Sequence, residues 1–279
     1  MVADEPSARV LALLVAVEHD LGESPELART KAGAAHVALT RSYAVYLGED
    51  PASRARLERE AALLRWAATQ GIPVPAVVER TADRLVTARV AADPQAGPRF
   101  VAAAIAASDS VVAADPPPRE LLRTSVSRRA PRHTIVRRFA RMSASPLSVT
   151  EFRAARAAAL ALPHDTMTHG DFHPRNLLYD RAAGVVRLID WATIGAAPAG
   201  TDLLSLWPQL PDPGDRAAVF PAAAEQVRDP QRLAVLHHWL AARYLADLVT
   251  GRPHRAWQWE RIDPAVDRVA EARPGGHAP

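Results

Sequence analysis

The 279-residue chain has no cysteine, which excludes disulfides, thiol nucleophiles and cysteine metal ligands. Lysine is almost absent, since Lys31 is the single lysine against 33 arginines. Long apolar runs are missing too: Val10 to Val17 spans eight residues, whereas a membrane-spanning helix needs roughly 20. The first six residues include two acids and no basic segment of the kind that opens an export signal. These absences predict a cytoplasmic protein without a membrane partner.

The charges that are present are unevenly spread. The formal net charge is only +3, yet residues 119–156 contain ten arginines and two acids. A basic segment of this kind can bind anions or nucleic acid. Neither interleaved aromatic residues nor a nucleic-acid-binding module accompanies it, so solvated helix faces explain it more simply. No nucleic-acid partner is predicted.

Secondary-structure signals divide the chain into two parts. The first part reads as a helix at 7–19, three short antiparallel strands within 27–47, a helix from Asp50 to Gly71 and a β-hairpin at 72–90. The second part is mostly helical, with two short strands expected at 177–179 and 185–189. We therefore predict an α+β fold with a small β-rich N-lobe at 1–90, a larger helical C-lobe at 91–272 and a flexible tail at 273–279.

One stretch carries the chemistry. "THGDFHPRNLLYD", residues 168–180, places Asp171 five residues before Asn176. This spacing matches a phosphotransferase catalytic loop, in which the carboxylate orients a hydroxyl nucleophile and the amide oxygen binds magnesium. A second metal-binding acid is expected at the end of the strands that follow, and Asp190 in "VVRLIDWATIG" occupies that position. Asn176 and Asp190 are therefore predicted to share Mg²⁺ on the nucleotide phosphates, because magnesium prefers oxygen ligands.

These motifs resemble a known family. "HGDFHPRN" followed by "LIDW" looks like the aminoglycoside phosphotransferase and choline kinase group, a branch of the protein-kinase-like fold. "LEREAALLRWAATQGIPVPAVV" is similar to the family's C-helix and next strand, and "GTDLLSL" resembles the segment under the catalytic loop. The resemblance covers residues from about 25 to 250. It implies a two-lobed fold, Mg²⁺ as cofactor, and transfer of the γ-phosphoryl group of ATP or GTP to a small-molecule hydroxyl.

The resemblance also implies roles for individual residues. Asp171 resembles the catalytic aspartate, and Asn176 and Asp190 resemble the metal ligands. Glu60 resembles the C-helix acid that pairs with a lysine on the third strand. The purine base is expected to meet the backbone of four consecutive residues: Thr87, Ala88, Arg89 and Val90. Three residues are expected to be structural at the site: His169, Trp191 and Asp202.

The chain departs from the family pattern on the third strand. Where the family has Lys or Arg, "YAVYL" has Ala44, Val45 and Tyr46. That lysine normally anchors the α and β phosphates as a compact charge. Lys31 and Arg41 are the candidates to replace it, and solvent-facing charges on edge strands are the alternative for both. A catalytically impaired, nucleotide-binding pseudokinase therefore stays an alternative function.

The acceptor is predicted in chemical class only. His173 and Arg175 are expected to contact it, and Trp239 and Tyr244 are expected to form a stacking wall, with core packing as the alternative for the aromatic residues. Polycationic aminoglycosides need an acidic pocket, whereas residues 192–279 hold ten acids against nine arginines. We therefore expect an antibiotic phosphotransferase for a neutral or anionic, for example nucleoside-type, acceptor. A metabolic small-molecule kinase acting on another alcohol is the alternative, and the chain is expected to be a monomer or a homodimer.

Three histidines near Asp171 raise a different possibility, a zinc hydrolase. His164, His169 and His173 lie four or five residues apart, and imidazoles at helical spacing bind zinc. Gly170 and Pro174 break any helix that would bring them together, and no general-base glutamate accompanies them. A zinc site is therefore not favoured.

Overall fold

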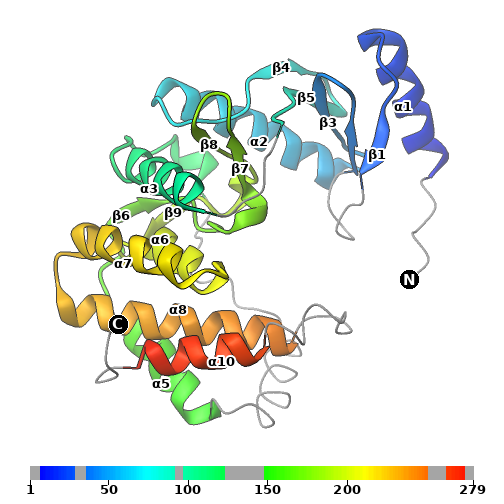
Figure 1. Ribbon diagram of the computed structural model, residues 1–279. Coiled ribbons are helices and arrows are strands. Elements are labelled where there is room, and N and C mark those ends of the chain that lie inside the picture. The colour runs from blue at the N-terminus through cyan, green and yellow to red at the C-terminus, as the bar shows by residue number, and fades with distance from the viewer. Residues whose placement is uncertain (1–6, 29–35, 92–96, 123–147, 251–261, 274–279) are drawn as a thin grey trace.

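The computed structural model describes residues 7–28, 36–91, 97–122, 148–250 and 262–273, which form a small sheet with two helices and a larger, mainly helical part (Figure 1). Lys31 and the expected flexible tail from residue 274 onward lie outside the described residues, so the predictions made for them are not tested. The predicted division into lobes at residue 90 also stays a prediction.

An antiparallel sheet forms the N-terminal part. Its strands are β1 (Glu26–Ala28), β2 (His36–Leu39), β3 (Tyr43–Leu47), β4 (Val77–Arg80) and β5 (Arg84–Ala88), in the spatial order β1-β2-β3-β5-β4. The predicted short strands and the β4–β5 hairpin are thereby confirmed. The sheet carries one helix on each face, α1 (Ala8–Leu21) and α2 (Pro51–Thr69).

Alternation along β3 decides which side chains face which helix. Successive side chains of a strand point to opposite faces. Val45 and Leu47 belong to the buried cluster that α1 forms with the sheet. Tyr46 packs against the cluster that includes α2 and the C-terminal part. Tyr46 therefore lies on the face of the sheet that packs against α2 and the C-terminal part.

Helix α2 begins and ends where the sequence predicts. The Asp50 side chain accepts a hydrogen bond from the Ser53 backbone N–H at 2.7 Å, and Pro51 occupies the first helical turn. Both features favour a helix start, because the cap satisfies an otherwise unpaired N–H group and proline lacks one. Gly71 follows the helix at a positive φ of 72°, which a glycine adopts without steric cost.

The C-terminal part consists of helices and two small antiparallel pairs of strands. Its helices are α3 (Pro98–Val112), α5 (Val149–Leu160), α6 (Thr201–Leu206), α7 (Pro213–Val227), α8 (Pro230–Thr250) and α10 (Ile262–Glu271). Among the described residues of this part, four single 3₁₀ turns lie between these elements: η1 (Arg119–Leu121), η2 (Pro174–Asn176), η3 (Trp191–Thr193) and η4 (Trp207–Gln209). Helix α8 packs against α5, α6, α7 and α10, so it is central to this part (Figure 1).

The two strand pairs frame the "THGDFHPRN" segment. β7 (Leu177–Asp180) and β8 (Val185–Leu188) form the predicted hairpin. β6 (Thr166–Thr168) pairs with β9 (Gly195–Ala197), and neither strand was predicted. Three-residue strands have too few side chains to show a period of two, so their pairing depends on the tertiary structure.

Candidate active site

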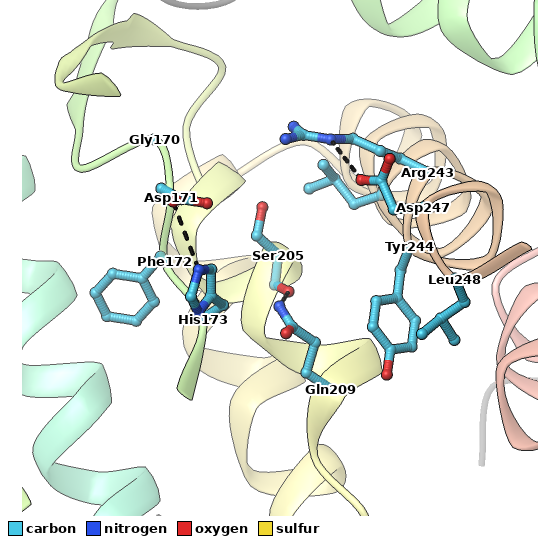
Figure 2. Close-up of a pocket in the computed structure, with 11 residues that line it drawn as sticks. Gly170, Asp171, Phe172, His173, Ser205, Gln209, Arg243, Tyr244, Asp247 and Leu248 are labelled. Carbon is cyan, nitrogen blue, oxygen red and sulfur yellow. Dashed lines mark hydrogen bonds and ion pairs between the residues drawn. The ribbon is translucent and has the colours of Figure 1, made fainter. Parts of the chain in front are cut away.

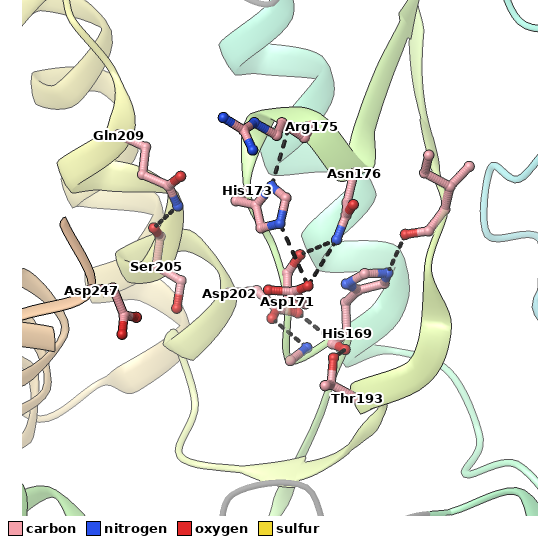
Figure 3. Close-up of polar contacts among 12 residues, drawn as sticks. His169, Asp171, His173, Arg175, Asn176, Thr193, Asp202, Ser205, Gln209 and Asp247 are labelled. Atoms are coloured by element: carbon pink, nitrogen blue, oxygen red, sulfur yellow. Dashed lines mark hydrogen bonds and ion pairs between the residues drawn. The ribbon is translucent and has the colours of Figure 1, made fainter. Parts of the chain in front are cut away.

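The side chain of Asp202 holds the loop between β6 and β7 in place. Its carboxylate accepts the backbone N–H of His169 at 2.7 Å and that of Gly170 at 3.0 Å (Figure 3). Burial and the charge of Asp171 raise the pKa of Asp202 to about 6, although the two hydrogen bonds act to lower it. Gly170 has a φ of 79°, and a Cβ there would collide with the carbonyl oxygen of Thr193. The loop therefore requires both the acid and the glycine.

His169 is a buried structural residue of this loop. Its Nε2 lies 3.1 Å from the Ile189 carbonyl oxygen, and its ring meets that of Trp191 edge-on at 4.7 Å. Burial lowers the pKa of His169 to about 4, so the ring is neutral at pH 7 and donates Nε2–H to the carbonyl. The hydroxyl of Thr193 donates to the His169 carbonyl oxygen at 3.1 Å. These contacts tie the loop to the segment after β8.

Asp171 is a carboxylate with defined partners. Its Oδ2 accepts a hydrogen bond from the Asn176 amide at 3.1 Å and lies 3.5 Å from Nε2 of His173 (Figure 3). Burial opposes its ionisation, but the contact with His173 and the charges of His173, His169 and Arg243 outweigh burial, so the pKa of Asp171 is lowered. Asp171 is therefore ionised at pH 7 and oriented from two sides.

Asn176 and Asp190 flank the same end of the β7–β8 hairpin. The backbone N–H of Ile189 donates to the Asn176 carbonyl oxygen at 3.1 Å. The Asn176 amide nitrogen donates to Asp171, which leaves the amide oxygen as the atom that could accept a ligand. Asp190 is exposed and has a left-handed backbone, with φ 61° and ψ 66°. An amide oxygen and a carboxylate from the same end of the hairpin are ligand types that fit Mg²⁺, which takes oxygen ligands and retains several waters.

Helix α2 fixes the turn that carries Asp190. Glu60 accepts the backbone N–H of Trp191 at 3.1 Å, and the neighbouring Arg59 donates to the Ala192 carbonyl oxygen at 3.3 Å. Burial raises the pKa of Glu60 to about 7, and the charge of Asp190 adds to this. The expected C-helix acid is thus in place, but its hydrogen bond goes to a backbone N–H and not to a lysine of the third strand.

Tyr46 is one of the three residues, with Ala44 and Val45, that occupy the stretch where the lysine was expected. β3 is in register with β5, with Val45 opposite Val86, so "YAVYL" is the third strand and carries no cation. Burial raises the pKa of Tyr46, and the charges of Glu60 and Asp190 raise it further. Its hydroxyl also bonds to Thr87. A neutral phenol therefore lies beside the two acids that a lysine would have matched.

The remaining expected nucleotide contacts are only partly available. The backbone N–H of Ala88 already donates to Ala76 and that of Arg89 to Ser42, both at 2.8 Å. Among the backbone N–H groups of residues 88–90, that leaves Val90 for a purine base. Thr87 is buried, and its side chain faces Tyr46. Arg41 is exposed in the β2–β3 turn, where its charge helps lower the pKa of Glu23.

A pocket of about 220 Å³ opens beside Asp171 (Figure 2). It is lined by residues 170–173, by Ser205 and Gln209, and by α8. Five residues of α8 contribute: Leu240, Arg243, Tyr244, Asp247 and Leu248. The expected contacts His173 and Tyr244 are therefore at the pocket.

Two other expected acceptor contacts are not. Trp239 packs on Phe152 of α5 with ring centroids 5.1 Å apart, because its position on α8 faces the neighbouring helix. Arg175 is exposed outside the pocket lining. Sequence analysis missed Ser205, Gln209, Arg243 and Asp247. A signal existed for α8, since positions 240, 243, 244, 247 and 248 form one helix face by their spacing.

Within the described residues, no group of three or more histidines and acids is arranged to hold a metal ion, and His164 is exposed. No helix in the described ranges is both long and apolar enough to cross a membrane.

Several solved structures share this fold. ADP-bound aminoglycoside phosphotransferase APH(2'')-Ib aligns with 96% of this chain and 99% of that chain, at 12% identity and a TM-score of 0.58. A choline/ethanolamine kinase family protein from Mesorhizobium loti aligns with 95% of this chain and 93% of that chain, at 17% identity and a TM-score of 0.61. The macrolide 2'-phosphotransferase MphH from Brachybacterium faecium aligns over 92% and 98% of the two chains, at 19% identity and a TM-score of 0.52.

The family assignment comes from sequence. A comparison with curated proteins gave no match. The model of the phosphotransferase enzyme family matches residues 35–254, which is more than half of the chain. Together with the shared fold, this confirms the predicted protein-kinase-like α+β architecture and the expectation of a phosphotransferase. The chain belongs to the phosphotransferase enzyme family.

Proposed function

We propose that the protein transfers the γ-phosphoryl group of ATP or GTP to a hydroxyl of a small molecule, with Mg²⁺ as cofactor. The observation that carries this proposal is the position of Asp171. It is an ionised carboxylate at the edge of an open pocket and is hydrogen-bonded to Asn176, whose backbone bonds to Ile189, the residue before Asp190. A nucleoside triphosphate donor also agrees with a cytoplasmic location, which is part of the proposal.

Asp171 acts on the acceptor hydroxyl. The hydroxyl oxygen forms a bond to the γ-phosphorus, the bond from that phosphorus to the bridging oxygen of the β-phosphate breaks, and the hydroxyl proton passes to Asp171. A carboxylate with a lowered pKa is a weak base. Phosphoryl transfer through a loose transition state needs little base strength, so orientation of the hydroxyl is the larger contribution.

Asn176 and Asp190 would bind Mg²⁺ through their amide and carboxylate oxygens. When bound, the ion neutralises charge on the β- and γ-phosphates. Glu60 and Arg59 keep the Asp190 turn in place through the backbone of residues 191 and 192. Val90 would contribute its backbone N–H to the purine base, because the neighbouring N–H groups are already paired.

The acceptor is proposed to be an antibiotic, since structures with this fold include aminoglycoside and macrolide phosphotransferases. A metabolic kinase is the second candidate. The described residues line a pocket of about 220 Å³, below the roughly 300–1,000 Å³ typical of drug-sized ligands, and a choline kinase shares the fold. A pseudokinase is the third candidate, because Tyr46 replaces the expected lysine.

Calorimetry of ATP and GTP binding, with and without Mg²⁺, tests the proposal. Asp190→Asn should weaken Mg²⁺-dependent binding about tenfold or more, since a charged metal ligand is lost. Asp171→Asn should bind nucleotide like the wild type and lose on the order of 100-fold or more in phosphoryl transfer. Asp165→Asn, an exposed acid just before β6, is the matched control. A near-normal transfer rate in Asp171→Asn would contradict the proposed role.

A further inference from the structure

The α8 side of the pocket carries a cation, Arg243. Arg243 extends from α8 toward the side on which Asp171 lies (Figure 2). Arg243 and Asp171 line the same pocket. Any acceptor whose hydroxyl reaches Asp171 therefore passes within the field of this guanidinium.

Arg243 has little compensation from its own helix. Within the described residues its ion-pair partner is Asp247, one turn later, and the contact joins Nε to Oδ2 at 3.9 Å. This is the long limit for an ion pair, and the two side chains remain 49% and 45% exposed. Such a pair contributes little. The ion-pair contact with Asp247 is made by Nε, and Arg243 is one of the residues that line the pocket.

A guanidinium in this state selects anions. Its planar fork matches a carboxylate or phosphate with two parallel hydrogen bonds. A polycation is disfavoured, because its ammonium groups would approach the Arg243 guanidinium in the pocket wall. Tyr244, Leu240 and Leu248 supply apolar surface for the carbon skeleton.

We propose that Arg243 determines acceptor specificity by binding a carboxylate of the acceptor, so that the substrate is a small hydroxycarboxylic acid and not a polycation. This rests on the proposed phosphotransferase function. It adds Arg243, a residue that the sequence did not single out, to the expected preference for a neutral or anionic acceptor, and it narrows that preference to an anion.

The test compares acids with their uncharged amides as acceptors. Glycerate and glyceramide, gluconate and gluconamide, and galacturonate and galacturonamide are used with ATP and Mg²⁺, and gentamicin serves as a polycation. The acid-to-amide ratio of kcat/KM should be about 10- to 100-fold in the wild type, the range expected for a hydrogen bond between charged groups. Arg243→Gln should bring this ratio close to one. Arg232→Gln is the matched control, because Arg232 lies on the same helix, is 50% exposed and pairs with a nearby acid outside this pocket.

Each result decides one question. Equal use of acids and amides by the wild type, preference for gentamicin, or an unchanged ratio in Arg243→Gln would overturn the anion proposal. A uniform loss with acids and amides would also overturn it, since Arg243 would then act on the phosphoryl group. Nucleotide hydrolysis without use of any acid rejects the acceptor class and leaves the phosphotransferase standing. Loss of nucleotide binding and hydrolysis in the wild type rejects the proposed function itself. Thermal melting of Arg243→Gln confirms that the variant is folded.

Discussion

Replacing Tyr46 with lysine tests how this chain binds nucleotide. Tyr46 lies on the face of β3 that packs against α2, and the charges of Glu60 and Asp190 act on its hydroxyl. Tyr46→Lys would place an ammonium group beside these carboxylates. A nearby cation favours an ionised acid, so the pKa of Glu60 should fall from its present value of about 7. The site would then contain the lysine and acid pair that the family resemblance implies.

The ion pair between the new lysine and the acids would form in the free protein as well as in the complex. Unit charges about 4 Å apart interact by about 4 kcal/mol at an effective dielectric constant of about 20, and desolvation of the ammonium group offsets part of this, so the pair holds the lysine in place while the gain in affinity comes from its contact with the nucleotide. Within the bound complex, a charge-assisted hydrogen bond to phosphate contributes about 1.5–3 kcal/mol. Nucleotide affinity should therefore increase about 10- to 100-fold in Tyr46→Lys.

Calorimetric titration with Mg²⁺-ATP at 25 °C measures this change. Tyr43→Lys is the control, because Tyr43 lies on the same strand but packs against the cluster on the α1 face. Tyr46→Phe separates loss of the phenol from gain of charge, and its affinity should stay within about threefold of wild type. A folded Tyr46→Lys protein that binds no more tightly, or an equal gain in Tyr43→Lys, would refute the idea that residue 46 takes the lysine's place.

Two further substitutions test the loop and the buried histidine. Gly170→Ala should cost about 2 kcal/mol or more of stability and most of the activity, because its Cβ would collide with Thr193 at a positive φ. Gly184→Ala, also at positive φ but with open space around it, should cost only about 1 kcal/mol, and equal losses would contradict this. Burial lowers the pKa of His237 to about 4. Below pH 6.5, therefore, this histidine binds a proton in the unfolded chain but stays neutral in the folded one. The free energy of unfolding should decrease by up to about 3 kcal/mol as the pH falls to 4. In denaturant titrations at pH 7 and pH 4.5, His237→Leu should lose less stability between the two pH values than the wild type. An unchanged pH dependence would show that His237 is not the source of the decrease.

The chemistry of the catalytic loop was predictable because it is local. Asp171 and Asn176 are five residues apart and Asp190 follows on the next hairpin, so short-range geometry brings them together. The third strand was predictable for the same reason, and the structure confirms that it contains no lysine. The roles of these residues in catalysis stay predictions.

The environment of each group was not predictable. Glu60 could have been an exposed helix charge or half of an ion pair, and the structure shows it bonded to the backbone of Trp191. Trp239 and Tyr244 were equivalent aromatic residues in the sequence. Their positions on α8 direct the first toward Phe152 and the second into the pocket.

The sequence by itself determined the two N-terminal helices, the mostly helical character of the second part, most strands, and the spacing of the acid, the amide and the second acid. These depend on periodicity and turn chemistry, which act over a few residues. Tertiary structure decided the charge state of Asp171, the partner of Glu60, the β6–β9 pairing and the acceptor wall on α8. Each depends on groups that are distant along the chain, because burial and Coulomb interactions are set by proximity in space.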